Sequence, residues 1–286
     1  MSTKVAEYDL EGAIAIVVPT YNRKEITRRF VENIRQQSDC IVVYVCDSGS
    51  TDGTLQEVSS MRGIKVVHVG CDAWWSAAVN RGIDQALADG YEAVLIMNDD
   101  IDFDRDVLAQ LSDKHKCFPN AIISPLQESP SGPFLGMRYF GWSKEMELLS
   151  RAEEDVFVDT TNGCCLLVPK AVFEAIGKID EIRCPHQYGD TEFQLRAKLA
   201  GFPTLACPGI KIAQLGATNY YARLKLGSIL NFPGSPLHFP AYSQFGLTLF
   251  GGGGQFLFCG MQYHYRYVKT LVKALLHLVR NNMFRP

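Results

Sequence analysis

The sequence predicts an α/β fold with a mostly parallel central sheet and helices on both faces. Two observations predict it: short apolar runs typical of strands buried on both faces, and segments with helical spacing of apolar residues between them. Strands and helices that alternate at this rhythm favour a parallel sheet with crossover helices. The predicted strands are residues 14–18, 41–46, 64–69 and 93–97, and the predicted helices between them are residues 25–37, 54–60 and 76–88.

The alternation ends after a predicted helix at residues 104–114. Residues 121–168 carry shorter apolar runs among Gly, Pro and aromatic residues, and two more helices are expected at 169–176 and 190–200. We therefore expect an α/β domain over residues 1–215, with halves at about 12–115 and 116–215, and a C-terminal region over residues 216–286.

Composition excludes several classes of protein. The chain of 286 residues is 47% hydrophobic and 21% charged, so it can bury a core and is not disordered. Its 9 cysteines include no CxxC pair, which argues against a zinc ribbon or a disulfide scaffold and for a reducing compartment. Residues 1–12 lack the apolar segment of a signal peptide, so we expect a cytoplasmic chain.

Charge is distributed unevenly along the chain. All 31 acidic residues lie at or before Glu192, and residues 193–286 contain basic side chains and no acidic one. The net charge of -3 therefore combines an acidic N-terminal part with a basic C-terminal part. Such an asymmetry indicates an anionic partner for the C-terminal region, either lipid or nucleic acid.

The last segment, residues 263–286, predicts an amphipathic helix with a basic polar face. A purely basic polar face is typical of helices at anionic lipid surfaces, and the alternative is a helix packed on the core with a solvated basic edge. No apolar run is long enough to predict a membrane span. The polar positions on the predicted face are Arg266, Lys269, Thr270, Lys273, His277 and Arg280.

Polar clusters follow three of the predicted strands. They read PTYNR, CDSGSTDGT and MNDDID, at residues 19–23, 46–54 and 97–102. Ligands of open parallel sheets bind outside the carboxyl ends of the strands, so these clusters predict a common site.

The strongest cluster is Asn98, Asp99 and Asp100, with Asp102 close behind. Adjacent carboxylates raise each other's pKa unless a cation or hydrogen-bond donors compensate. Hard oxygen ligands suit Mg²⁺ or Mn²⁺, which take one or two carboxylates together with phosphate oxygens. The alternative is an acidic turn that caps the helix expected near Asp104.

The order of the motifs resembles family 2 glycosyltransferases of the GT-A fold. The likeness covers roughly residues 12–205, and its finer placement is with the rhamnosyltransferase-like branch that builds bacterial cell-surface polysaccharides. The segments that carry it are IAIVVPTYNR, IVVYVCDSGSTDGT, NRGIDQAL, AVLIMNDDI, TNGCCLLVPKAVFEAIGKIDE and YGDTEFQLRAKLAGF.

The resemblance implies a nucleotide-sugar site in residues 12–115. Asp47 would accept an N–H from the base, Asp99 would lie near the ribose, and Asp100 would hold a Mg²⁺ or Mn²⁺ ion on the diphosphate. Asp102 would be a solvated reserve ligand. The other expected contacts to the nucleotide sugar come from Pro19, Thr20, Tyr21 and Asn80.

The resemblance also implies an acceptor half with a general base. Asp190 matches the second residue of the family's "ED" pair, near the start of a helix whose dipole would stabilise its anionic form. Gly189 replaces the first acidic residue, and Glu192 takes the place of a following Asp, so either Asp190 or Glu192 could be the base. Asp190 could also be only a helix cap, and Arg196 a partner of Glu192 one turn on.

Two smaller features complete the expected site. The family often places a His after this helix to complete the metal shell, where this chain has Gln214, and His186 is a substitute candidate. Trp74 and Trp75 could form an aromatic wall for sugar or base, or a buried pair at a helix entrance.

These expectations define an inverting, metal-assisted glycosyltransferase. It would move a sugar from a nucleotide diphosphate sugar to a hydroxyl of a glycan acceptor, which we expect to be lipid-linked, at the inner face of the cell membrane. A nucleotidyltransferase is the alternative enzyme, but the turn after the first strand lacks the Gly-rich loop that cradles a triphosphate. A nucleic-acid-binding or scaffold protein is disfavoured because residues 226–265 do not interleave aromatic with basic residues.

Overall fold

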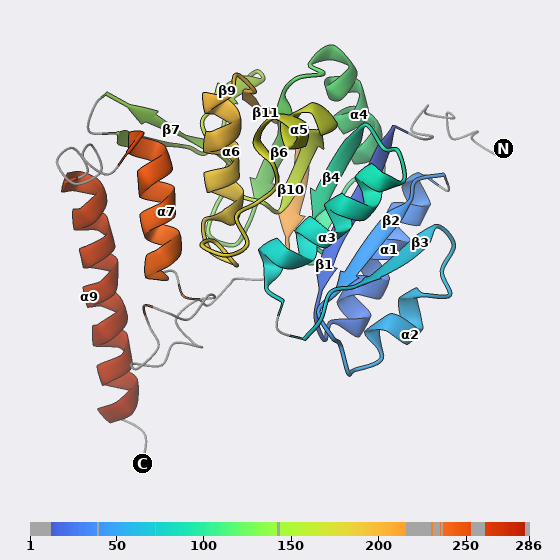
Figure 1. Ribbon diagram of the computed structural model, residues 1–286, viewed down its shortest axis with the longest axis horizontal. Helices are drawn as coiled ribbons and strands as arrows, with labels where there is room; N and C mark the ends of the chain where they lie inside the picture. The colour runs from blue at the N-terminus through green and yellow to red at the C-terminus, as the bar shows by residue number, and fades with distance from the viewer. Residues whose placement is uncertain are drawn as a thin grey trace.

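The fold was established from a computed structural model. It describes residues 13–38, 40–71, 73–141, 144–215, 230, 235, 237–252 and 261–283. The central feature is a 9-stranded sheet in the order β3-β2-β1-β4-β10-β6-β11-β5, with β9 paired to β11 (Figure 1). Its strands are β1 (Ile14–Thr20), β2 (Val43–Asp47), β3 (Ile64–His68), β4 (Ala93–Met97), β5 (Ile101–Phe103), β6 (Ile122–Glu128), β9 (Val156–Val158), β10 (Cys165–Pro169) and β11 (Thr204–Gln214).

Helices cover both faces of this sheet, as the sequence predicts. Alternate residues of β1 point to opposite faces: Ile16 lies in the apolar cluster with α1, α2 and α4, and Val17 lies in the cluster with α3, α5 and α6. The helices are α1 (Lys24–Gln37), α2 (Thr54–Val58), α3 (Trp75–Ala88), α4 (Val107–Cys117), α5 (Lys170–Ile176) and α6 (Gly189–Leu199).

The direction of the strands refines the prediction. Strands β3, β2, β1 and β4 are parallel, so the carboxyl ends of all four meet at one edge. Strand β10 runs antiparallel between β4 and β6, and its first residue, Cys165, pairs with Met97 at the last position of β4. The segment before β10 therefore joins the edge that carries the predicted site.

The segments after β4 contain more regular structure than the sequence predicts. Residues 101–103 form strand β5, which pairs with β11. Strands β7 (Gly136–Phe140) and β8 (Glu145–Leu149) form a separate antiparallel sheet. An unpredicted helix, α7 (Phe239–Phe250), packs against α6.

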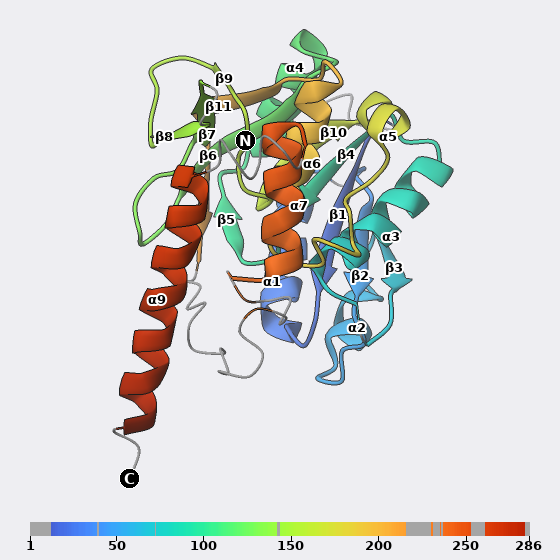
Figure 2. The ribbon, with the colours of Figure 1, turned by 60° about the vertical axis from the view of Figure 1, so that its left-hand side comes forward.

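The predicted C-terminal helix is present as α9 (Met261–Met283). It lies on the outer side of α7, and Figures 1 and 2 both show its C-terminal end extending away from the sheet. Tyr267, Leu271 and Leu275 pack against Leu237, whereas Lys269 and Lys273 are exposed. The exposed face is not purely basic, because Tyr265, Val268, Val272 and Leu276 are exposed beside the lysines. Arg266, His277 and Arg280 lie outside the described side chains.

None of the helices in the described ranges is both long and apolar enough to cross a membrane.

Candidate active site

The site begins where β1 and β2 end side by side. Thr20 and Asp47, the last residues of these strands, are paired in the sheet register. Strand β4 lies on the other side of β1, which places Asp99 next to Thr20. The Thr20 hydroxyl donates a hydrogen bond to Asp99 Oδ2 over 3.3 Å. Three of the sequence-predicted residues therefore meet at one edge of the sheet.

Asp99 is held by a set of hydrogen-bond donors. It is 1% exposed, and Thr27 Oγ1 donates to its Oδ2 over 2.8 Å. Arg23 forms ion pairs with Asp99 through Nη1 and, over 3.1 Å, with Asp100 through Nη2. Burial raises the pKa of Asp99, and the Arg23 charge and the Thr27 hydrogen bond oppose this rise. The adjacent carboxylates thus have the compensating cation that their spacing demands.

Asp100 keeps one oxygen uncommitted. Its Oδ2 accepts from Arg23, whereas its Oδ1 is buried and has no hydrogen-bond partner in the described part of the chain. Gln214 pairs with Ile101, and the N–H of Leu215 donates to the backbone oxygen of Asp100 over 2.9 Å. The position where the resemblance placed a metal-binding His is therefore adjacent to Asp100 and carries an amide.

The two carboxylate oxygens of Asp47 have different surroundings. It is 2% exposed, and its Oδ2 accepts from the backbone N–H groups of Gly49 and Ser50 over 3.0 and 2.9 Å. Its Oδ1 is buried with no hydrogen-bond partner in the described residues. These contacts fix the loop after β2 and leave one acceptor atom for a ligand.

The loop after β1 is tied to the loop after β2. Asn22 has a φ of 51°, and its N–H donates to Ser50 Oγ while its Oδ1 accepts from the Thr51 N–H, both over 2.8 Å. Pro19 is half-buried beside them, and Tyr21 is 55% exposed. The ring of Tyr21 is therefore accessible from solvent next to Asp47.

Asp190 lies in the first turn of α6. Its side chain extends to the segment before β10, which joins the same edge of the sheet. Its Oδ1 accepts from the Thr191 N–H over 2.8 Å, and its Oδ2 accepts from the N–H of Gly163. A Cβ on Gly163 would lie 2.9 Å from Asp190 Cβ and 3.0 Å from Trp75, so the close approach requires glycine. The residue is partly exposed, yet its carboxylate lies deep among protein atoms, and this burial raises its pKa.

Cys164 connects the two acidic centres. The thiol follows Gly163, and Asn98 Nδ2 contacts its sulfur over 3.8 Å. Burial raises the pKa of Cys164 to about 12, and the charges of Asp100 and Asp190 both add to this rise. Asn98, beside Asp100, contacts Cys164, and the preceding Gly163 donates to Asp190, so the two acidic segments approach each other at this segment.

Comparison with protein families identifies the family of this chain. Residues 15–177, more than half of the chain, match the model of glycosyl transferase family 2. The chain belongs to this family. The match spans β1 to α5 and includes Asp47, Asp99, Asp100 and Gly163, and it excludes the expected nucleotidyltransferase alternative as the family of this chain.

A curated relative supports the family 2 assignment. The low-salt glycan biosynthesis hexosyltransferase Agl10 of Haloferax volcanii is 25% identical over 196 residues, or 65% of this chain. The match spans 61% of the length of that protein.

Solved structures share the fold. GalNAc-T7 with UDP, GalNAc and Mn²⁺ has a TM-score of 0.58 at 13% identity, over 72% of this chain and 44% of that one. The mannosyltransferase PcManGT from Pyrobaculum calidifontis, in complex with GDP-Man and Mn²⁺, has a TM-score of 0.55 at 15% identity, over 95% and 81% of the two chains. TarS of S. aureus has a TM-score of 0.55 at 18% identity, over 83% and 43%. These likenesses confirm the GT-A fold, and none of them shows the rhamnosyltransferase branch.

Within this family 2 chain, Asn80 has a different surrounding from the other expected ligands. It is 2% exposed, and its side-chain amide bonds Ile179 through both the backbone N–H and the backbone oxygen. Its Nδ2 also donates to Glu181 over 2.8 Å. The amide thus attaches α3 to the segment before α6, and we do not carry Asn80 into the proposed sugar-donor site.

The structure distinguishes the two candidate bases of the family 2 motif. Glu192 is 0% exposed, and Arg196 Nε donates to both of its oxygens over 3.0 and 2.9 Å. Thr248 of α7 donates a further hydrogen bond over 2.9 Å. Glu192 is enclosed by these partners, which favours Asp190 as the base.

The departure at Gly189 also has a physical reason. A Cβ there would lie 2.6 Å from Ser76 Oγ and 3.0 Å from the Cys184 backbone oxygen. The Ser76 hydroxyl donates to that same oxygen over 2.6 Å. The packing of α3 against the segment before α6 therefore leaves no room for the acidic side chain that the family shows at this position.

The two tryptophans have different roles in the site edge. Trp75 Nε1 donates to Asn98 Oδ1 over 3.0 Å, which ties α3 to the acidic segment. The Trp74 ring lies 5.6 Å from the His186 ring, centroid to centroid. Both tryptophans are half-buried, so they are not the fully buried pair that was one alternative, and the aromatic wall stays a prediction. Asp102 is exposed on β5, as expected, and accepts from Asn33 over 3.2 Å.

Sequence reasoning assigned no role to Arg23, Thr27 or Cys164. The sequence does contain a signal for Arg23. Adjacent carboxylates at a strand end need a counter-charge, and the motif PTYNR places an arginine at the same edge of the sheet. Thr27 and Cys164 had none, since their contacts depend on how α1 and β10 pack.

The residues present fit a Mg²⁺ or Mn²⁺ ion that is completed by phosphate. The described chain contains no group of three or more His, Cys, Asp or Glu side chains that could enclose a metal. Asp100 Oδ1, a hard oxygen with no hydrogen-bond partner among the described residues, matches the one or two carboxylates by which such ions are bound together with substrate phosphates.

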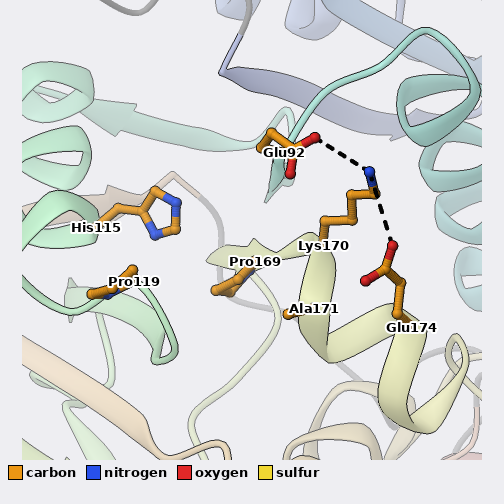
Figure 3. Close-up of a pocket in the computed structure, with 7 residues that line it drawn as sticks. All are labelled: Glu92, His115, Pro119, Pro169, Lys170, Ala171 and Glu174. Atoms are coloured by element: carbon orange, nitrogen blue, oxygen red, sulfur yellow. Dashed lines mark hydrogen bonds and ion pairs between the residues drawn. The ribbon is translucent and has the colours of Figure 1, made fainter.

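An open pocket lies at the opposite end of the sheet (Figure 3). It lies at the start of β4 and the end of β10, where Lys170 forms ion pairs with Glu92 over 3.2 Å and with Glu174 over 3.9 Å. These charged groups satisfy one another. The pocket is thus separate from the family 2 site, which lies at the carboxyl end of β4.

Proposed function

We propose that this chain is an inverting glycosyltransferase that moves a hexosyl or deoxyhexosyl group from a nucleoside diphosphate sugar to a hydroxyl of a glycan acceptor. The observation that carries the proposal is the pair of carboxylates near Cys164: Asp100, whose Oδ1 has no partner among the described residues, and Asp190, which is bound to the N–H of Gly163 and has a raised pKa. Family membership and the hexosyltransferase relative support the reaction class.

The sugar donor would bind along the ends of β1, β2 and β4. Asp47 Oδ1 would accept an N–H from the base, and Tyr21 would cover the base from the solvent side, with Pro19 and Thr20 below it. Asp99 would be held near the ribose by Arg23 and Thr27. The UDP and GDP-Man of the structural relatives show that one fold accepts different bases, so a screen must include several.

Asp100 would hold a Mg²⁺ or Mn²⁺ ion against the diphosphate, and Gln214 or His186 would be the nearest candidates to complete its shell. When bound, such an ion neutralises the charge that develops on the departing nucleotide. When the diphosphate binds, the Arg23 guanidinium would divide its hydrogen bonds between the Asp100 carboxylate and the phosphates. A guanidinium can bind either group through two N–H donors.

Asp190 would act as the general base. Its carboxylate would remove the proton from the acceptor hydroxyl while that oxygen forms a bond to the anomeric carbon. The bond from the anomeric carbon to the phosphate oxygen breaks, and its electron pair leaves with the nucleoside diphosphate. A single displacement of this kind inverts the anomeric configuration. Burial supports the role, because a raised pKa makes Asp190 a stronger base than an exposed Asp.

The acceptor would be a glycan on a lipid diphosphate, presented at an anionic membrane surface, and the donor sugar could be rhamnose. Helix α9 supports the membrane part of this proposal. Its exposed row of Tyr265, Val268, Val272 and Leu276 has helical spacing, and Lys269 and Lys273 flank it. An apolar row beside lysines, in a region without acidic residues, suits insertion among anionic headgroups.

Vesicle flotation tests the membrane part. Val272→Asp with Leu276→Asp should abolish binding to phosphatidylglycerol vesicles, and neither protein should bind vesicles of phosphatidylcholine alone. Leu148→Asp is the control, because Leu148 is equally exposed (55%) but lies on β8. Unchanged binding of the double variant would refute the proposed surface.

A sugar-donor screen tests the reaction. The full chain with Mn²⁺ or Mg²⁺ is incubated with UDP-, dTDP- and GDP-sugars and a lipid diphosphate-linked glycan, and nucleoside diphosphate release is followed. Release from one class of sugar donor, lost in Asp100→Ala and in Asp190→Ala, is expected. Metal-independent release that survives Asp100→Ala would contradict the proposed mechanism.

A further inference from the structure

The buried carboxylate of Glu192, two residues after the proposed base, connects α6 to α7. Glu192 is fully buried, and its Oε1 accepts from Thr248 Oγ1 of α7 over 2.9 Å. Gln244, one turn earlier on α7, approaches the same oxygen with Nε2 at 3.4 Å. A buried carboxylate depends on such partners, because an unpaired charge in this position is strongly unfavourable.

The Glu192 contacts extend to a third helix. Arg196 binds both oxygens of Glu192 and also donates to the backbone oxygens of Ile176 and Lys178 over 2.7 and 2.8 Å. These oxygens belong to the end of α5 and the turn that follows it. Glu192 and Arg196 together therefore connect α6 to both α5 and α7.

A second contact holds the other side of the proposed base. Tyr188, directly before α6, has a left-handed backbone with a φ of 62°, and its ring lies 5.2 Å from the ring of Phe245 on α7. Phe245 is 3% exposed and packs in one apolar cluster with Leu195 of α6. A non-glycine residue in the left-handed region is maintained by its surroundings, and here Phe245 provides them.

We propose that α7 is part of the catalytic unit and that Thr248 is a positioning residue for Asp190. The residues two positions before and two positions after Asp190 are each held by α7, so α7 fixes the turn from which the carboxylate reaches the Gly163 N–H. This inference rests on the proposed function, because it concerns the base of that reaction.

The C-terminal helix α9 packs against α7, and so is connected, through α7, to the helix that carries the proposed base. Tyr242 of α7 stacks on Tyr267 of α9 with 3.9 Å between ring centroids, and its hydroxyl contacts His264. The sequence predicts a boundary at residue 215 and a C-terminal region for acceptor and membrane association. Contacts within the described residues run from α9 to α7 and from α7 to α6, and Figure 1 shows these helices one beside the next. The C-terminal helices support the base as well as presenting a surface.

The test uses the full chain and an isosteric change. Thr248→Val keeps the side-chain shape and removes the hydroxyl that donates to Glu192, Thr248→Ser restores that hydroxyl, and Ser243→Ala changes a hydroxyl elsewhere on the same helix. We expect kcat for sugar transfer to fall about 10- to 100-fold in Thr248→Val, a loss typical of a slightly misplaced catalytic group. The KM for the sugar donor should stay within about twofold, because that site lies on other elements. Thr248→Ser and Ser243→Ala should retain the wild-type kcat.

Amide hydrogen exchange provides a readout that does not require activity. The N–H groups of Gly163 and Thr191 are bonded to Asp190, so they should exchange faster in Thr248→Val while the amides of β1 and β4 exchange as in the wild type. Wild-type kcat together with wild-type exchange at Gly163 and Thr191 would overturn the proposal, as would faster exchange spread evenly over the whole sheet. If the unmodified chain transfers no sugar, the proposed function fails, and exchange still decides whether α7 holds Asp190.

Discussion

The two acidic centres of the site are surrounded in opposite ways. Asp99 is enclosed by a guanidinium and two hydroxyl groups, from Arg23, Thr20 and Thr27. Asp190 receives only backbone N–H groups, from Gly163 and Thr191, and no described cation pairs with it. Burial raises the pKa of both carboxyl groups, but at Asp99 the charge of Arg23 opposes the rise, whereas at Asp190 only backbone hydrogen bonds oppose it.

This difference separates two tasks that the sequence shows only as clusters of aspartates. In the proposed function, the β1–β4 edge would hold the nucleotide and its metal, and the start of α6 would supply the proton acceptor. The supporting elements differ as well: Arg23, directly before α1, and Thr27 of α1 bind Asp99, whereas Thr248 of α7 binds Glu192 near Asp190.

The largest expected effect is on turnover by the α6 centre. Asp190→Asn should lower kcat for sugar transfer about 10²- to 10⁴-fold, because a neutral amide takes no proton from the acceptor hydroxyl. Steady-state kinetics measures it. Asp102→Asn is the matched control, since Asp102 is an exposed carboxylate that should leave kcat unchanged. Near-normal turnover of Asp190→Asn would remove the distinction between the two centres.

Asp47 tests the specificity of the other edge. In Asp47→Asn one amide oxygen can still accept from Gly49 and Ser50, but an N–H₂ group replaces the open oxygen Oδ1. Loss of one charge-assisted hydrogen bond should weaken binding of the cognate nucleoside diphosphate about 10- to 100-fold. Isothermal titration calorimetry in the presence of Mn²⁺ measures the affinity, and equal Kd values for both proteins would show that Asp47 does not contact the base.

Arg23 tests how the first centre is stabilised. Arg23→Gln should lower the free energy of unfolding by about 1–2 kcal/mol, because Asp99 then lies buried without its cation. The loss stays below that of a fully buried pair, since the Arg23 side chain is 37% exposed and partly screened by solvent. Urea denaturation measures it, with Arg28→Gln as a control in surface ion pairs on α1, the helix that Arg23 precedes. A smaller loss for Arg23→Gln than for Arg28→Gln would contradict the account.

The smallest effect is on pH dependence. Because burial raises the pKa of Asp190, the acid limb of the kcat profile should lie above the ordinary Asp value of about 3.9. The folded chain also holds this proton more tightly than the unfolded chain. Stability from this group is therefore present below the unfolded pKa and is lost as pH rises through the raised folded value, a slope that Asp190→Asn removes. An acid limb at or below 3.9 would show that the Asp190 environment stabilises its charge.

The N-terminal half of the fold could be predicted because β1, β2 and β4 are buried on both faces, and only β3 at the sheet edge is partly exposed. Strand β4 begins and ends at the predicted residues, and the strand ends at Thr20 and Asp47 place the predicted ligands together. The antiparallel direction of β10 could not be predicted, because an apolar run does not encode which way its strand points.

Helix α7 was not predicted, because its segment carries no charge and no polar face to mark it. The same reason hides its contact with Glu192: the sequence shows Glu192 and Arg196 one turn apart, but not that Thr248, 56 residues later, completes the group. Contacts between residues far apart along the chain therefore decide that Glu192 is enclosed and that Asp190 is partly exposed.

The most direct test of the central claim compares Asp100→Asn with Asp190→Asn in two assays. One assay measures the affinity for the nucleoside diphosphate with Mn²⁺, and the other measures turnover with the same sugar donor and acceptor. The account predicts that turnover falls in both variants and that nucleotide affinity falls, by about tenfold or more, only in Asp100→Asn. Equal loss of nucleotide affinity in both variants, or full turnover in Asp190→Asn, would contradict the division of the site into a nucleotide-holding edge and a base.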